Sequence, residues 1–142
     1  MSKKPNIKII VADYYKDIAT NLTSSAVELL KRNKLSYEII SVPGVYEIPQ
    51  MIKWHIKDKS INCFLALGCV IKGDTYHFEV ISDSVGKALL DLVNNNKRTL
   101  IANGIINSYN MTQAKKRAQR NSSKNKGLEA ASAMVKMIQC LI

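Results

Sequence analysis

The chain has 142 residues, 46% of them hydrophobic, which is enough length and apolar content for one domain, residues 1–142, with a single core. Its formal net charge of +10 indicates an anionic partner, whether a nucleic acid, an acidic surface or an acidic small molecule. Because no apolar run reaches membrane-spanning length and the three cysteines lack metal-site spacing, the sequence predicts a cytoplasmic protein with reduced thiols, no metal and no membrane contact.

The basic residues are scattered, except for a dense cluster within residues 115–126. Aromatic residues do not interleave with this cluster in the sequence, as they do in surfaces that stack single-stranded bases. We therefore interpret the cluster as a site for a phosphorylated small molecule, and we expect no nucleic acid partner.

The first half of the chain reads as strand, helix, strand, helix. The β-branched run at 7–12 predicts a strand, and Asp17 is expected to cap a helix that ends at about Asn33. A second strand at 37–42 ends in a Pro/Gly turn, after which a helix with Glu47 at its start runs to about Lys57.

A short apolar strand at 63–67 then leads through a glycine-containing loop, which begins at Gly68, into a helix that ends at about Asn94. A helix start of this kind attracts phosphate, because its backbone N–H groups converge at the positive end of the helix dipole. Thr75 adds a hydroxyl donor, and His77 adds a side chain that exchanges protons near neutral pH. These residues alone leave open whether the loop binds a ligand or merely turns the chain.

A fourth strand at 99–106 and helices at 111–119 and 126–141 complete the predicted elements. The alternation predicts an α/β fold in which helices cover both faces of a parallel sheet. Ligands bind such folds outside the carboxyl ends of the strands. The loops that we expect at those ends hold Tyr14, Glu47, His77 and Asn103.

Three segments resemble, in order and spacing, the 6,7-dimethyl-8-ribityllumazine synthase family: Val42–Pro49, Gly68–Glu79 and Asn125–Ala131. The resemblance covers essentially the whole chain and implies a flavodoxin-like three-layer sandwich with about four parallel strands. It also implies the penultimate step of riboflavin synthesis. In that step 5-amino-6-(D-ribitylamino)uracil condenses with 3,4-dihydroxy-2-butanone 4-phosphate, without a metal or an organic cofactor.

The resemblance implies roles for particular residues in binding the ribitylaminouracil. Tyr14 corresponds to the aromatic that stacks on the pyrimidine, although alone it would read as an ordinary loop tyrosine. The segment that binds the ribityl chain corresponds to Val45, Tyr46 and Glu47, and the strand end that reads the pyrimidine edge through main-chain groups corresponds to Cys69, Val70 and Ile71. Taken alone, Glu47 would read as a carboxylate favoured by a helix start.

For the other substrate, the resemblance implies that Asp74, Thr75 and Arg117 bind the phosphate. Lys126 is expected to support the site, and His77 is implied to transfer protons. Asn103 stands where many members of the family have a phenylalanine that touches the pyrimidine from a neighbouring subunit. An amide at that position could hydrogen-bond the ring instead of stacking on it.

The family builds its sites between adjacent subunits of five-membered rings, so the resemblance implies a homo-oligomer. The connection at 119–124 looks one residue longer than in shell-forming members and is basic, and a charge of +10 per chain repels neighbouring rings. We expect a pentamer or a pair of pentamers. The alternative functions are a non-catalytic flavodoxin-like module that binds phosphate or a flavin, and a basic nucleic-acid-binding protein.

Overall fold

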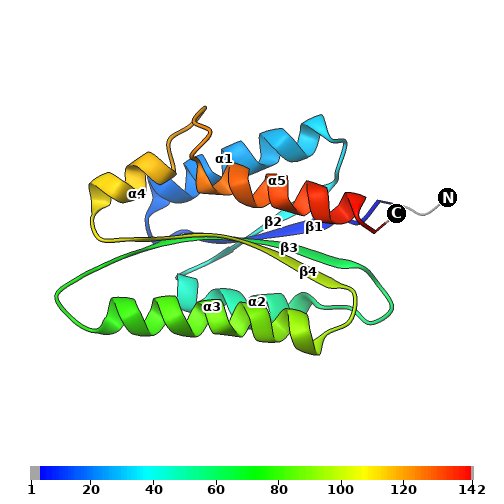
Figure 1. The fold of residues 1–142 in the computed structure, drawn as a ribbon, viewed down its shortest axis with the longest axis horizontal. Helices are drawn as coiled ribbons and strands as arrows, with labels where there is room; N and C mark the ends of the chain where they lie inside the picture. The colour runs from blue at the N-terminus through cyan, green and yellow to red at the C-terminus, as the bar shows by residue number, and fades with distance from the viewer. Residues whose placement is uncertain (1–3, 142) are drawn as a thin grey trace.

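The computed structural model describes residues 4–141 as a sheet of parallel strands with helices on both faces (Figure 1). In chain order the elements are β1 (Ile7–Ala12), α1 (Lys16–Arg32), β2 (Tyr37–Val42), the 3-10 turn η1 (Val45–Glu47), α2 (Ile48–His55), β3 (Asn62–Ile71), α3 (His77–Asn95), β4 (Thr99–Ser108), α4 (Met111–Arg117) and α5 (Lys126–Gln139). No helix in this described part of the chain is long and apolar enough to cross a membrane.

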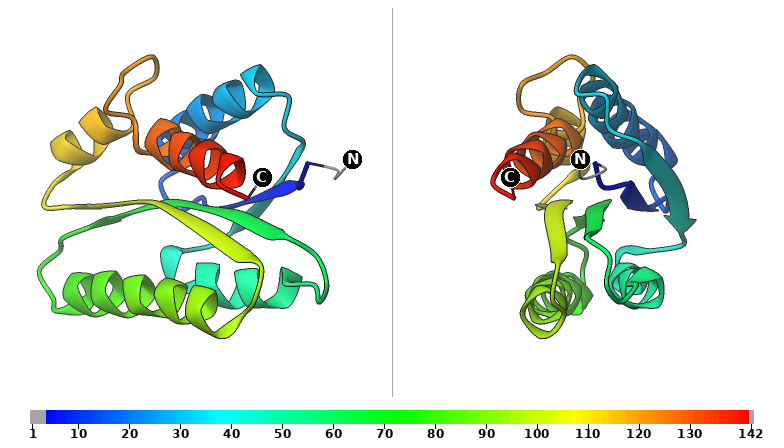
Figure 2. Two further views of the ribbon diagram at one scale, coloured as in Figure 1. Left: turned by 45° about the vertical axis from the view of Figure 1, so that its right-hand side comes forward. Right: turned by 90° about the vertical axis from the view of Figure 1, so that its right-hand side faces the viewer.

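The strands are ordered β2-β1-β3-β4, and all neighbouring pairs are parallel. Helices α1, α4 and α5 cover one face, and α2 and α3 cover the other (Figure 2). Parallel strands need crossover connections, which the helices supply. The predicted three-layer α/β fold with four parallel strands is confirmed.

The sheet separates two apolar clusters. On one face the sheet packs against the α1 and α5 residues Leu22 and Met134, and on the other against the α2 and α3 residues Ile48 and Val85. All but the last residue of β3 are buried, as expected for a strand covered on both faces. The central strand is therefore a rigid support for whatever lies at its carboxyl end.

Two strands extend further than the sequence predicted. β3 continues to Ile71 and β4 to Ser108, so Gly68 lies inside a strand rather than at the start of a loop. The β3–β4 ladder runs unbroken past this glycine, from Asn62–Thr99 to Ile71–Ser108. Glycine is needed here for close packing, because a Cβ atom would lie 2.9 Å from Val45 Cγ2. The loop before α3 is correspondingly short, residues 72–76.

The helix ends also differ in detail. Asp17 does not cap α1. The capping position is Tyr15, whose side chain makes no cap hydrogen bond. Asp17 lies in the first turn of the helix, where its negative charge interacts favourably with the helix dipole. α2 ends at His55 rather than Lys57. The Asn62 side chain accepts from Lys57 N at 2.9 Å and donates to Lys57 O at 3.0 Å, which holds the segment after α2 out of the helix.

The Asn125–Gly127 segment has a structural role. Asn125 is fully buried, and its Oδ1 accepts from the backbone N–H groups of Gly127 and Leu128 at 2.9 and 3.1 Å, which caps α5. Its Nδ2 donates to Gln119 O at 3.1 Å, which ties down the loop after α4. Gly127 lies directly against the backbone of Leu22, so that α1 and α5 pack closely.

Gly127→Ala is therefore expected to destabilise the fold by about 1–3 kcal/mol, because the added Cβ collides with backbone that cannot rotate away. Gly86→Ala is the matched control, since Gly86 lies within α3 with nothing near its Cβ position and should gain about 0.5–1 kcal/mol. Urea unfolding of the three proteins measures both effects. Equal midpoints for Gly127→Ala and the parent would contradict the close helix contact.

Candidate active site

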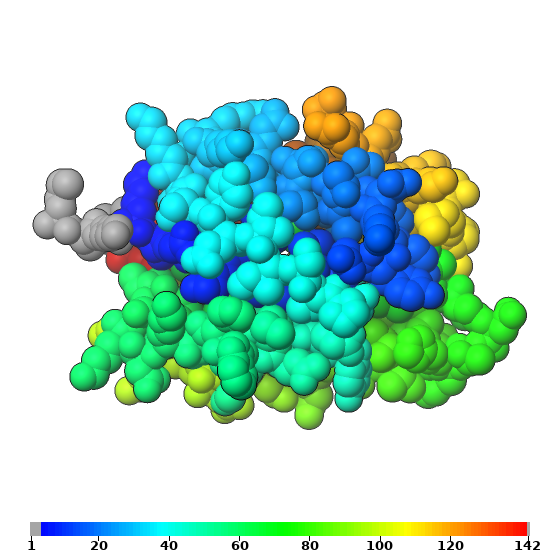
Figure 3. Space-filling view, turned by 180° about the vertical axis from the view of Figure 1, so that it is seen from behind, coloured from blue at the N-terminus to red at the C-terminus, as the bar shows by residue number. Residues whose placement is uncertain are grey.

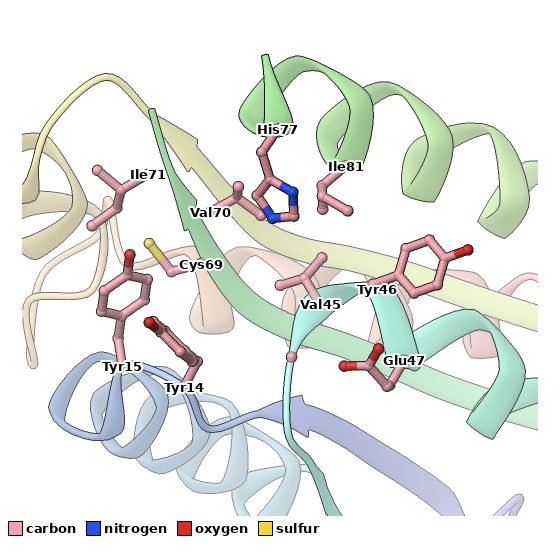
Figure 4. A pocket seen from close by; sticks show the side chains of 11 residues that line it. Tyr14, Tyr15, Val45, Tyr46, Glu47, Cys69, Val70, Ile71, His77 and Ile81 are labelled. Atoms are coloured by element: carbon pink, nitrogen blue, oxygen red, sulfur yellow. The ribbon is translucent and has the colours of Figure 1, made fainter. Parts of the chain in front are cut away.

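A cavity of about 600 Å³ opens at the carboxyl edge of the sheet, between the ends of β1 and β3 (Figure 4). The chain leaves β1 toward β2 on one side and leaves β3 toward β4 on the other, so the cavity lies at the switch point where such folds bind ligands. Its walls come from the ends of β1 and β3, from η1 and from the start of α3. They are Tyr14, Tyr15, Gly44, Val45, Tyr46, Glu47, Cys69, Val70, Ile71, His77 and Ile81.

Aromatic rings lie on two sides of this cavity (Figure 4). Tyr14 is 74% exposed and meets the ring of Tyr15 edge-on, with centroids 5.0 Å apart. Tyr46 contributes a second exposed ring from η1. A planar heterocycle entering the cavity would meet the exposed face of the Tyr14 ring, which packs edge-on against Tyr15.

The η1 turn supplies the acid of the cavity. Val45 is buried and anchors the turn, while Glu47 is half-buried with its carboxylate lying over Gly44, so that a Cβ at Gly44 would come within 2.9 Å of Glu47 Oε1. Among residues 4–141 the ion pairs do not include Glu47. Its carboxylate can therefore accept hydrogen bonds from hydroxyl groups of a ligand.

The end of β3 presents main-chain groups to the cavity. The β1–β3 ladder ends at the pair Val11–Leu67, so on the β1 side residues 68–71 have no strand partner. Burial raises the pKa of Cys69 to about 11, although a hydrogen bond with the Ser108 side chain opposes the shift. The thiol is thus protonated at neutral pH and is no nucleophile there. This wall therefore offers backbone N–H and C=O groups, rather than a thiolate, to a ligand.

His77 is the first residue of α3, and its exposed imidazole lies on the cavity wall opposite Tyr14 (Figure 4). Its backbone N–H donates to Thr75 Oγ1 at 3.4 Å, which orients the start of the helix. His55 differs, since its Nδ1 lies 2.9 Å from Met51 O and it lines none of this cavity. Of the two histidines, only His77 is placed for proton transfer to a ligand here.

The β3–α3 loop projects beyond the rest of the molecule at this edge (Figure 3). Its base is fastened by Lys72, whose Nζ lies 3.9 Å from Glu79 Oε1 and 5.6 Å from the Tyr109 ring centroid. Asp74 and Thr75 are exposed, and neither is among the residues that line the cavity. Their part in phosphate binding stays a prediction.

A second cavity, of about 490 Å³, lies beside the end of β4 and is basic. Arg117 lines it together with Lys116, Lys124 and Lys126. Within residues 4–141, the ion pair that involves these side chains joins Lys126 Nζ to Glu129 Oε2, 3.9 Å apart. Within one chain, the structure therefore puts Arg117 and His77 in different cavities.

Asn103 does not lie in a loop at the carboxyl edge, so that expectation is wrong. It sits inside β4, paired with Ala66, and its exposed side chain accepts from Ile105 N at 2.9 Å. The strand is longer than the sequence suggested, which leaves Asn103 several residues short of its end. It lines neither of the two cavities.

Some residues of the two cavities were missed by the sequence analysis. Ile81 lies one turn beyond His77, and helical periodicity alone could have put it on the same wall. Tyr15 carried no separate signal beyond its position next to Tyr14. In residues 4–141, no group of three or more His, Cys, Asp or Glu side chains is placed to hold a metal ion.

The fold and the first cavity define a flavodoxin-like α/β protein with a cavity at the switch point of its sheet, the position at which such folds bind small ligands. A family model described as 6,7-dimethyl-8-ribityllumazine synthase matches residues 4–141, and this chain belongs to that family.

Relatives that carry the name 6,7-dimethyl-8-ribityllumazine synthase agree with this assignment. One from Bartonella bacilliformis is 43% identical over 136 residues, which covers 94% of this chain and 88% of the relative. One from Agrobacterium fabrum is 38% identical over 141 residues, covering 96% and 94%. One from Buchnera aphidicola is 39% identical over 143 aligned positions, covering 97% and 88%.

Proposed function

We propose that this chain condenses 5-amino-6-(D-ribitylamino)uracil with 3,4-dihydroxy-2-butanone 4-phosphate to give 6,7-dimethyl-8-ribityllumazine, phosphate and water. One observation carries the proposal: a member of this family has a cavity that combines an exposed aromatic face, unpaired main chain, a free carboxylate and a histidine. The enzyme is a transferase of riboflavin biosynthesis. The reaction takes place in the cytoplasm, where the buried Cys63 and Cys69 stay reduced.

The ribitylaminouracil fills the first cavity. Tyr14 stacks on the pyrimidine, which contributes about 0.5–1.5 kcal/mol beyond burial. Main-chain groups of Cys69, Val70 and Ile71 form hydrogen bonds with the polar edge of the pyrimidine ring. These groups are available because no strand pairs with this side of β3. The ribityl chain lies along Val45–Glu47, and its hydroxyl groups donate to the Glu47 carboxylate.

The butanone phosphate binds through its phosphate. Main-chain N–H groups at Asp74 and Thr75, before the start of α3, take one side of the phosphate. Arg117 binds the other side of the phosphate, because a guanidinium donates two parallel hydrogen bonds to a pair of phosphate oxygens. Lys126, which lines the same cavity, adds positive charge beside it. The Asp74 carboxylate points to solvent in this arrangement, away from the anion.

The chemistry consists of additions and eliminations that each move a proton. The substrate amine attacks the butanone carbonyl, the carbinolamine loses water to form an imine, phosphate leaves by elimination, and ring closure releases a second water. His77 relays protons between these groups, an effect typically worth about 10²–10⁴-fold. The amine is already a nucleophile and phosphate a good leaving group, so holding the substrates together supplies much of the acceleration.

The two cavities are brought together by assembly. Because Arg117 and His77 line different cavities in one chain, we propose that the basic cavity of one copy completes the first cavity of its neighbour in a ring. Asn103, exposed on the same edge strand as the basic cavity, then faces the neighbour's substrate. This arrangement makes a homo-oligomer necessary for activity.

The assembly is expected to be a pentamer or a pair of pentamers, because the basic connection after α4 and the +10 charge oppose the stacking of many rings. Light scattering should give a mass of about five or ten chains. A shell of about sixty chains would refute the restriction to one or two rings. A catalytically active monomer would refute the shared site.

Turnover tests the function itself. Purified protein with both substrates should form the lumazine chromophore and release one phosphate for each lumazine. Binding of phosphate or a flavin without turnover would instead support the non-catalytic module. Binding of a duplex with a steep salt dependence and no turnover would support the nucleic-acid alternative.

A further inference from the structure

Tyr15 occupies a position where a different kind of residue would serve the helix better. It is the capping residue of α1, with extended backbone angles (φ −98°, ψ 92°), and its side chain caps nothing. Asn110 and Asn125 do cap α4 and α5 with their side chains. Ser, Thr, Asp or Asn at this position would stabilise the helix, so an aromatic here, like Tyr76 before α3, departs from the local preference, and what its side chain contacts decides whether it has another role.

The ring of Tyr15 is fixed in place. It is half-buried against the core cluster beneath α1 and meets Tyr14 edge-on at 5.0 Å, with an interplanar angle of 85°. Its hydroxyl end points toward the Cys69–Ile71 wall of the first cavity (Figure 4). Tyr15 thus touches both features that receive the pyrimidine in the proposed function, the stacking ring and the open end of β3.

The hydroxyl of Tyr15 is a neutral donor. Burial, followed by the neighbouring Cys69 and Tyr14, raises its pKa above the ordinary value, and no hydrogen bond from the described residues contributes to the shift. The nearby Cys69 thiol is also protonated and is engaged with Ser108. The proton of the Tyr15 hydroxyl is therefore available to an acceptor on a ligand.

We propose that Tyr15 is a positioning residue for the ribitylaminouracil: its ring sets the angle of Tyr14, and its hydroxyl donates a hydrogen bond to a carbonyl oxygen of the pyrimidine. This inference rests on the proposed function. It gives Tyr15 a role toward one substrate only, because the butanone phosphate is held by other residues. Selectivity between the two substrates is therefore the property to measure.

Tyr15→Phe removes the hydroxyl and keeps the ring. The KM for the ribitylaminouracil should rise about two- to tenfold, the range of one neutral hydrogen bond. The KM for the butanone phosphate, the kcat and the thermal midpoint should stay close to those of the parent. Tyr37→Phe is the matched control, since Tyr37 starts β2 and lines neither cavity.

An unchanged KM for the ribitylaminouracil in Tyr15→Phe would overturn the assignment, and so would an equal rise for both substrates, which indicates a merely structural role. Equilibrium binding of the ribitylaminouracil alone separates this inference from the proposed function. A parent protein that binds it more tightly than Tyr15→Phe does, yet makes no lumazine, would refute the catalysis and support the role of Tyr15. Equal binding by the two proteins would overturn that role.

Discussion

His77→Ala is expected to lower kcat about a hundredfold, the low end of what a positioned acid–base group contributes, and to leave measurable activity. The residual rate has a physical reason: the cavity still holds the two substrates together, and proximity supplies much of the acceleration. Because His77 lies at the exposed start of α3, its removal should hardly change either KM or the stability. Steady-state kinetics with each substrate varied in turn measures this.

His55→Ala is the matched control, since that imidazole contacts Met51 O on α2 and is outside the cavity. It should leave kcat unchanged. A kcat in His77→Ala equal to that of the parent would remove His77 from the mechanism. Complete loss of activity in a folded His77→Ala protein would contradict the large contribution assigned to positioning.

Arg117→Ala should weaken the binding of the butanone phosphate about tenfold or more, because a hydrogen bond to a charged group contributes roughly 1.5–3 kcal/mol. Binding of the ribitylaminouracil should be nearly unchanged. The affinity of Arg117→Lys for the butanone phosphate should lie between those of the parent and Arg117→Ala. Lysine keeps the positive charge but loses the paired hydrogen-bond geometry of the guanidinium. Calorimetric titration with each substrate separately gives these affinities.

Arg32→Ala serves as the control for charge alone. Arg32 is an exposed arginine at the end of α1 that pairs with Glu28 at 3.3 Å and lines neither cavity. It lowers the net charge as much as Arg117→Ala does and should leave both affinities intact. If Arg117→Ala weakened the binding of both substrates equally, Arg117 would be stabilising the fold or the subunit contact rather than binding the phosphate.

The sequence predicted the fold where patterns are local. The bounds of β1 and β2 were predicted correctly, because β-branched runs and flanking turn residues mark them. The end of β3 was wrong, because Gly68 reads as a turn signal in sequence but lies where the side chains of Val45 and Ala12 leave no room for a Cβ. Tertiary packing, which no local pattern encodes, explains that glycine.

The candidate site likewise contains residues that the sequence could predict and residues that depend on tertiary packing. The residues at the ends of β1 and β3 could be predicted, since parallel strands bring their carboxyl ends to one edge, and Tyr14, Glu47 and His77 do line one cavity. Tyr15 could not be assigned, because its orientation depends on packing beneath α1. The separation of Arg117 from His77 could not be seen either, since it follows from which face of the sheet each helix covers.

Mixing two defective variants tests most directly whether one catalytic site is built from the two cavities of neighbouring copies. His77→Ala and Arg117→Ala chains, unfolded together and reassembled in equal amounts, should form rings in which about a quarter of the sites combine an intact His77 side with an intact Arg117 side. With butanone phosphate well below its KM, where both variants are slow, lumazine formation should then rise to about a quarter of the parent rate, well above the mean of the two variants assembled separately. Activity that stays at that mean would contradict the shared site.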